Sequence, residues 1–103
     1  MKIAITGHAS ISPLGLRPEE IKNSIYSKDS CIKWNGENMV SSFTIKEENE
    51  LAELRRIRSY KELDKSVLMA ILAARQIDNI PKTNDTAINI GSSRGATDLW
   101  EKF

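Results

Sequence analysis

The chain has 103 residues, of which 40% are apolar and 28% charged, and its formal net charge is +1. This length allows one domain at most, and the charge gives no electrostatic reason to expect nucleic acid or an anionic membrane as a partner. The single cysteine, Cys31, excludes an internal disulfide and a cysteine-only metal site. The chain lacks an N-terminal secretory signal and an apolar run of about 18 residues, so we expect a cytoplasmic protein without a membrane span.

The N-terminal part of the chain is predicted to form a strand, a loop and a helix. Residues 2–6 alternate in polarity, which indicates a short strand that ends at Gly7. The Ser-Pro-Leu-Gly sequence of residues 12–15 is typical of a turn. Pro18 is followed by two glutamates, which predicts a helix that begins there and ends between residues 27 and 30. Its apolar residues share one face, as in a surface helix: Ile21 and Ile25.

The next segment is predicted to contain a hairpin and a charged helix. Asn35-Gly36 is a strong turn signal between two strand-like pieces, residues 32–34 and 39–45. Residues 46–58 are rich in charge and favour a helix with a narrow apolar stripe: Leu51, Leu54 and Ile57. We interpret the remaining side chains of this helix as a solvated face.

A strongly apolar helix is expected at the centre of the fold. Residues 67–74 are eight consecutive apolar side chains within a helix predicted over residues 60–77, with Ser59 and Glu62 as a capping box. At about 100° per residue, such a run leaves no polar face, so the helix needs cover on every side. We therefore predict layers above and below it, more than so short a chain is expected to supply.

The C-terminal part is predicted to form a loop, a strand, a turn and another helix. Residues 79–85 are polar, residues 86–90 read as a second strand, and a glycine-rich turn follows. Thr97 is the expected cap of a helix over residues 98–103, which carries Leu99, Trp100 and Phe103. Because the sequence stops within this aromatic helix, we expect residues 1–103 to be the N-terminal fragment of a longer protein.

Three features are candidate sites. Cys31 is a candidate nucleophile, but it follows a helix and has no spacing relation to the only histidine, His8, so a small buried hydrophobe is the favoured interpretation. His8 is alone in a loop, where a hydrogen-bonded structural role is favoured over a ligand or base. The turn that contains Gly91 and Arg94 resembles an anion cradle at a helix start, but it lacks a nucleotide motif, and a tight strand-to-helix turn is the favoured alternative.

Several stretches share their order and spacing with one enzyme family. Residues 3–15 combine a strand with Thr-Gly, Ser-Pro and Gly, and residues 18–32 combine a helix with the ending Lys-Asp-Ser-Cys-Ile. Residues 63–75 begin with Leu-Asp-Lys and have an alanine-rich face, and residues 90–95 form a Gly-Ser-x-x-Gly turn after a strand. Together they resemble the N-terminal portion of a β-ketoacyl-acyl carrier protein synthase of the thiolase-like condensing enzymes. The resemblance is weakest over residues 34–56.

The resemblance implies an α/β fold, the N-terminal part of a five-layered αβαβα architecture with the central helix buried against a mixed sheet. It implies an acyltransferase of fatty-acid or polyketide synthesis that needs no cofactor or metal. In such enzymes a cysteine takes an acyl group from acyl carrier protein, and two histidines, or histidine and asparagine, promote decarboxylation of the malonyl thioester. The resulting carbanion attacks the acyl thioester.

The family's catalytic residues lie beyond the stretch that this chain matches, so we expect it to carry none and to be inactive alone. The resemblance assigns the turn formed by Gly91, Ser92, Arg94 and Gly95 to the border of the acyl pocket, near a homodimer or heterodimer interface. Arg94 departs from the small or apolar residue usual there. It favours a polar polyketide substrate, or a non-catalytic chain-length-factor-like partner subunit. A small anion- or nucleotide-binding module is the alternative from another class.

Overall fold

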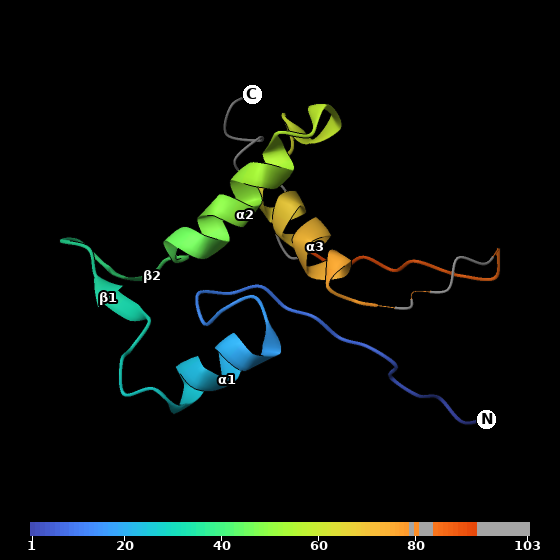
Figure 1. Ribbon diagram of the computed structural model, residues 1–103, viewed down its shortest axis with the longest axis horizontal. Helices are drawn as coiled ribbons and strands as arrows, with labels where there is room; N and C mark the ends of the chain where they lie inside the picture. Colours follow the sequence, from blue (N-terminus) through green and yellow to red (C-terminus); the bar gives the residue numbers. More distant parts are fainter. Residues whose placement is uncertain (79, 81–83, 93–103) are drawn as a thin grey trace.

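The residues that the structure describes form a small α/β arrangement of three α-helices and one two-stranded antiparallel sheet (Figure 1). It is seen in a computed structural model that describes residues 1–78, 80 and 84–92. A 3₁₀ turn, η1, separates the last two α-helices. The elements in chain order are α1 (Pro18–Tyr26), β1 (Ile32–Trp34), β2 (Met39–Ser41), α2 (Ile45–Arg55), η1 (Arg58–Tyr60) and α3 (Lys65–Arg75).

Helix α1 begins at Pro18, as predicted, and ends at Tyr26. Proline suits this first position because the amide hydrogen that it lacks has no intrahelical acceptor there. The Glu20 carboxylate reaches back and accepts hydrogen bonds from the backbone amides of Leu16 and Arg17, at 3.1 and 3.2 Å. A carboxylate in the first turn also interacts favourably with the positive end of the helix dipole. The predicted start of this helix is confirmed.

A tight turn at residues 12–15 leads into α1. The amide of Gly15 donates to the carbonyl of Ser12 at 2.9 Å, and the Ser12 hydroxyl accepts from the amide of Leu14 at 3.2 Å. Gly15 has a φ of 139°, and a Cβ added there would lie 2.7 Å from the Cβ of Glu20. Only glycine therefore fits this position without strain, because of both its backbone angle and the close approach of α1.

The predicted hairpin is confirmed. Strands β1 and β2 pair antiparallel, with Trp34 opposite Met39, and the side chain of Asn35 accepts from the amides of Glu37 and Asn38. Strand β2 ends at Ser41, whereas the sequence predicted a strand to residue 45. The strand is shorter because Thr44 is already the N-cap of α2, which begins at Ile45, so residues 42–44 form the connection to this helix.

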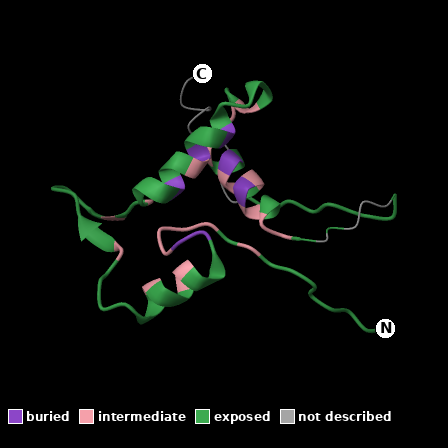
Figure 2. Ribbon diagram, in the orientation of Figure 1, coloured by how far each residue is buried: buried purple, intermediate pink, exposed green. Residues whose placement is uncertain are grey.

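The core lies between α2, α3 and the residue that follows the tight turn (Figure 2). Helices α2 and α3 pack against each other, and the predicted stripe of α2 is confirmed at its two leucines. All the buried apolar side chains of the core cluster are leucines: Leu16, Leu51, Leu54, Leu68 and Leu72. Burying each contributes roughly 1.5–3 kcal/mol, so this cluster is the main source of stability among the described residues.

Helix α3 begins at Lys65, so its predicted start at residue 60 is wrong. Asp64 is the N-cap and accepts from the amide of Ser66 at 2.8 Å, whereas Ser59 lies in η1 and forms no capping box. Arg55 explains the difference, because its guanidinium donates to the carbonyls of Lys61 and Leu63 at 3.1 and 3.0 Å. These hydrogen bonds hold residues 61–63 in a non-helical turn before the cap.

Cover around α3 is one-sided. Leu68 and Leu72 are buried, but Val67 is 37% exposed, and Ala70 and Ala74 are also exposed. The helix packs against α2, and the mixed sheet predicted beside it is absent from the described residues. The need for apolar cover inferred from the sequence is therefore met on one face only.

The two terminal strand predictions are wrong for this structure. Residues 2–6 and 86–90 form no strand, and their isoleucines are largely exposed: Ile3 84%, Ile5 88%, Ile88 81% and Ile90 88%. A strand needs an adjacent edge for its backbone hydrogen bonds, and the described part of the chain pairs neither segment with another strand. In agreement, the radius of gyration is 16.3 Å, above the roughly 13 Å expected for a compact chain of this length.

Candidate functional site

The glycine-rich turn assigned to an acyl pocket is only partly described. Gly91 and Ser92 are exposed, and a Cβ added to Gly91 would meet no atom within 4 Å. Arg94 and Gly95, together with the predicted helix at residues 98–103, lie outside the described residues. The candidate anion cradle and acyl-pocket border therefore stay predictions.

Cys31 and His8 lie at different places. Cys31 is half-buried just before β1 and lines a hollow of about 410 Å³ rich in serine hydroxyls. His8 is exposed and lines a different hollow, beside α1. The structure does not pair the thiol with the imidazole, so it gives no support to Cys31 as a histidine-activated nucleophile.

The described part of the chain offers neither a metal site nor a membrane span. No group of three or more histidine, cysteine, aspartate and glutamate side chains is arranged to hold a metal ion there. No helix over the same residues has the length and apolarity needed to cross a membrane.

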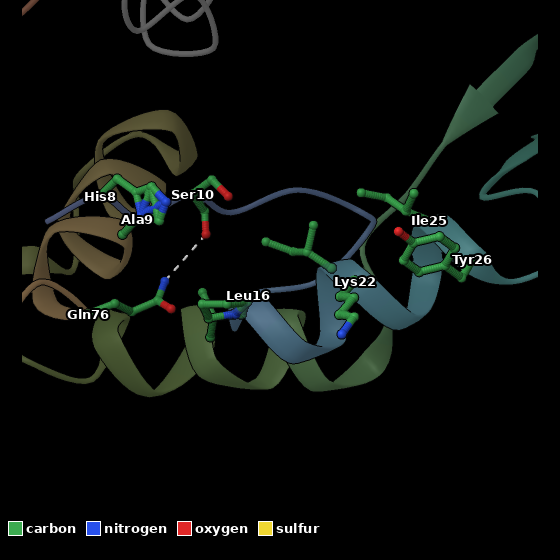
Figure 3. Close-up of a pocket in the computed structure, with 10 residues that line it drawn as sticks. His8, Ala9, Ser10, Leu16, Lys22, Ile25, Tyr26 and Gln76 are labelled. Atoms are coloured by element: carbon green, nitrogen blue, oxygen red, sulfur yellow. Dashed lines mark hydrogen bonds between the residues drawn. The ribbon is translucent and has the colours of Figure 1, made fainter.

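A hollow of about 560 Å³, which we name the α1 hollow, lies beside α1 (Figure 3). Residues 8–10 and Gln76 lie at one end, and Lys22, Ile25 and Tyr26 of α1 lie toward the other. Its apolar wall comes mainly from Pro18, Ile21 and Ile25 of α1, together with Leu16, which lies two residues before the helix. Its size is within the roughly 300–1,000 Å³ typical of sites for small molecules.

Contacts with α3 and the following residue hold the far wall of the α1 hollow. The side-chain amide of Gln76 donates to the carbonyl of Ser10 at 3.4 Å, as Figure 3 shows. A Cβ added to Gly7 would lie 3.0 Å from Cγ2 of Ile77, so the backbone approaches closely there. The extended N-terminal segment is thereby attached to the end of α3 at residues 7–10.

Ion pairs attach the near wall, α1, to α2. The Glu20 carboxylate pairs with Lys46, and Arg17 pairs with Glu50 at 3.3 Å. The hydrogen bond from Lys46, followed by those from the amides of Leu16 and Arg17, lowers the pKa of Glu20 from 4.5 to about 2. Glu20 therefore stays ionised at neutral pH and positions α1 against the core.

The wall of the α1 hollow that α1 forms was predictable from the sequence, whereas the wall formed by residues 8–10 was not. The i, i+4 spacing of Ile21 and Ile25 predicted an apolar face on this helix, and both residues line the hollow. Residues 8–10 gave no comparable signal, because their position depends on the contact with Gln76, 66 residues later in the chain.

Comparisons with known proteins add no functional assignment. No family model, no curated protein and no solved structure matches this chain.

Proposed function

We propose that the chain is the N-terminal portion of a β-ketoacyl-acyl carrier protein synthase-like protein. The parent protein would catalyse decarboxylative condensation of acyl and malonyl thioesters delivered by acyl carrier protein. Within a homodimer or heterodimer, α3 would lie between the two sheets of a five-layered αβαβα fold. The observation that carries the proposal is the order and spacing of the matching sequence stretches, beginning with residues 3–15.

The geometry of residues 12–15 supports the first of these stretches. The Ser-Pro-x-Gly part of the resemblance forms a hydrogen-bonded turn, and its last residue has the positive φ and close approach that require glycine. The resemblance at Gly15 therefore has a physical reason. Substitution there would change the position of α1.

The one-sided cover of α3 is a second supporting observation. Val67, Ala70 and Ala74 form an apolar, exposed surface opposite the leucine core. Leaving such a surface in water forfeits roughly 25 cal/mol for each Å² of apolar area that a further layer would bury. A fold with an additional layer on this side accounts for the exposed apolar surface.

Arg94 favours a second candidate with the same fold. A cationic side chain at the acyl-pocket border disfavours a long saturated acyl chain, because burying a charge beside hydrocarbon is costly. A chain-length-factor-like subunit that shapes the pocket of a catalytic partner accommodates this residue. A small anion-binding module that uses Gly91 and Arg94 remains the alternative outside this class.

The reading frame that follows Phe103 provides the first test. A catalytic synthase requires a cysteine at a helix start and, later, two histidines or a histidine and an asparagine. Another residue at the cysteine position, with the remaining fold pattern retained, supports the partner-subunit candidate. The absence of both that helix start and the later condensing-enzyme pattern overturns the family proposal.

Activity of the protein encoded by the complete frame is the second test. Incubation with malonyl- and acyl-carrier protein should release carbon dioxide and form a 3-oxoacyl thioester. A chain-length-factor-like subunit should do so only with its catalytic partner. Phosphate and nucleotide titration of the 103-residue chain by calorimetry tests the anion-binding alternative, which the absence of heat at millimolar concentration excludes.

A further inference from the structure

The α1 hollow combines an apolar wall with one cationic side chain, Lys22, at its rim. Among the described residues, no aspartate or glutamate lines it. Lys22 is exposed and forms no ion pair among the residues that the structure describes. Among the described residues, therefore, no carboxylate neutralises this ammonium group.

We propose that the α1 hollow binds a small monocarboxylate with an apolar body. The body would lie against Ile21 and Ile25, where its burial is favoured by roughly 25 cal/mol per Å² of apolar area. The carboxylate would pair with Lys22 at the rim. The single positive charge of Lys22 suits a ligand with a single negative charge. Since no described acidic side chain lines the hollow, a cationic ligand is disfavoured.

An aromatic body suits the hollow best. Tyr26 lines the end of the hollow that α1 forms, and ring pairs add to the stabilisation that area alone provides. The hydrogen bond from Gln76 to the carbonyl of Ser10 links the far wall to the end of α3 without a ligand present. The inference does not use the glycine-rich turn, whose described residues, Gly91 and Ser92, do not line this hollow.

The test is a titration of the isotopically labelled 103-residue chain, followed by amide chemical shifts. Three probes share one ring system and differ in charge: naphthalene-2-carboxylate, the neutral naphthalene-2-carboxamide and the cationic naphthalen-2-ylmethylamine. We expect the carboxylate to bind most tightly and the amine least. The largest shifts should fall at residues 8–10, at α1 and at Gln76.

Two variants with matched controls separate charge from apolar contact. Lys22→Gln should weaken carboxylate binding about threefold to fivefold, as expected for one exposed ion pair, and should bring its affinity close to that of the carboxamide. Lys28→Gln, a nearby lysine outside the hollow, should leave the affinity unchanged.

Ile25→Glu should weaken carboxylate binding more than tenfold, since it removes apolar contact and adds a like charge. Its control is Ile45→Glu, outside the hollow; Ile25 and Ile45 are 62% and 81% exposed, so neither change disturbs the core. Equal affinities for the three probes would overturn the proposal. So would shifts centred outside the hollow, no shifts at millimolar probe, or unchanged binding in the Lys22→Gln variant.

Discussion

The helix pair α2–α3 and the segments 2–6 and 86–90 contain similar proportions of apolar side chains, but only the helix pair buries them. Leu68 and Leu72 of α3 are 0% and 8% exposed, whereas Ile5 and Ile90 are each 88% exposed. A helix satisfies its backbone hydrogen bonds within one segment, so two helices need only side-chain contact in order to pack. A strand needs a second strand before its side chains can form a surface.

The hairpin refines this comparison. Strands β1 and β2 are shorter than the expected terminal strands, yet they pair, because a local turn at Asn35 brings them together. Residues 2–6 and 86–90 have no such turn between them, and about 80 residues separate them in sequence. The difference lies in the entropy of bringing distant segments together, which grows with the length of the intervening chain.

The largest expected effect is at the centre of the helix pair. Leu68→Ala should lower the free energy of unfolding by about 3 kcal/mol, because it removes buried methyl groups and leaves a cavity. Ile88→Ala, at a largely exposed position, should change it by less than about 0.5 kcal/mol. Urea unfolding followed by circular dichroism measures both. Equal effects would contradict the contrast between the two regions.

Substitution of Gly15 tests whether the turn before α1 packs closely against this helix. Gly15→Ala should cost about 2 kcal/mol, because the φ of 139° is strained for alanine and the new Cβ would contact Glu20. Gly36→Ala is the matched control: its φ is 103°, but no atom lies within 4 Å of the new Cβ, so about 1 kcal/mol is expected. Thermal unfolding distinguishes the two, and a smaller loss at Gly15 than at Gly36 would count against the close approach of α1.

Substitutions at the start of α3 test whether Asp64, and not the predicted Ser59, caps this helix. Asp64→Ala should destabilise the chain by about 1 kcal/mol through loss of the N-cap, and Asp64→Asn should retain much of the cap. Ser59→Ala should have little effect, because Ser59 makes no side-chain cap hydrogen bond to α3. Chemical denaturation of the three variants provides the comparison. A larger loss at Ser59 would restore the longer helix predicted from the sequence.

The smallest expected effect is a pH dependence from Glu20. Its folded-state pKa is lowered to about 2, so its contribution is complete above about pH 4.5 and is lost as the pH falls toward 2. Because its partner Lys46 is exposed, we expect a loss of only about 1 kcal/mol. Glu20→Gln should flatten the stability profile between pH 5 and 2, whereas Glu19→Gln should not. If stability depends on pH in the Glu20→Gln variant as it does in the original chain, Glu20 does not cause the pH dependence.

Local signals predicted much of the fold. Pro18 located the start of α1, Asn35-Gly36 located the hairpin turn, and the stripe of Leu51 and Leu54 identified the buried face of α2. Each of these features depends on neighbouring residues in the sequence. Their physical causes are therefore visible without coordinates.

Features that depend on contacts between distant residues could not be predicted from the sequence. Ser59 and Asp64 are both acceptable caps, and the choice follows from the hydrogen bonds of Arg55 to residues 61 and 63. The α1 hollow depends in the same way on Gln76, which positions the backbone of Ser10. Alternation in residues 2–6 indicates a capacity to form a strand, and the presence of an edge decides whether the strand forms.

The most direct test of the central contrast is amide hydrogen exchange of the 103-residue chain. We expect the amides of Leu68 and Leu72 to be protected to the level of global unfolding, since they lie in the buried helix pair. The amides of Ile3, Ile5, Ile88 and Ile90 should exchange at rates close to those of an unstructured peptide. Protection of these isoleucines equal to that of α3 would show that the terminal segments are paired, and would contradict the account.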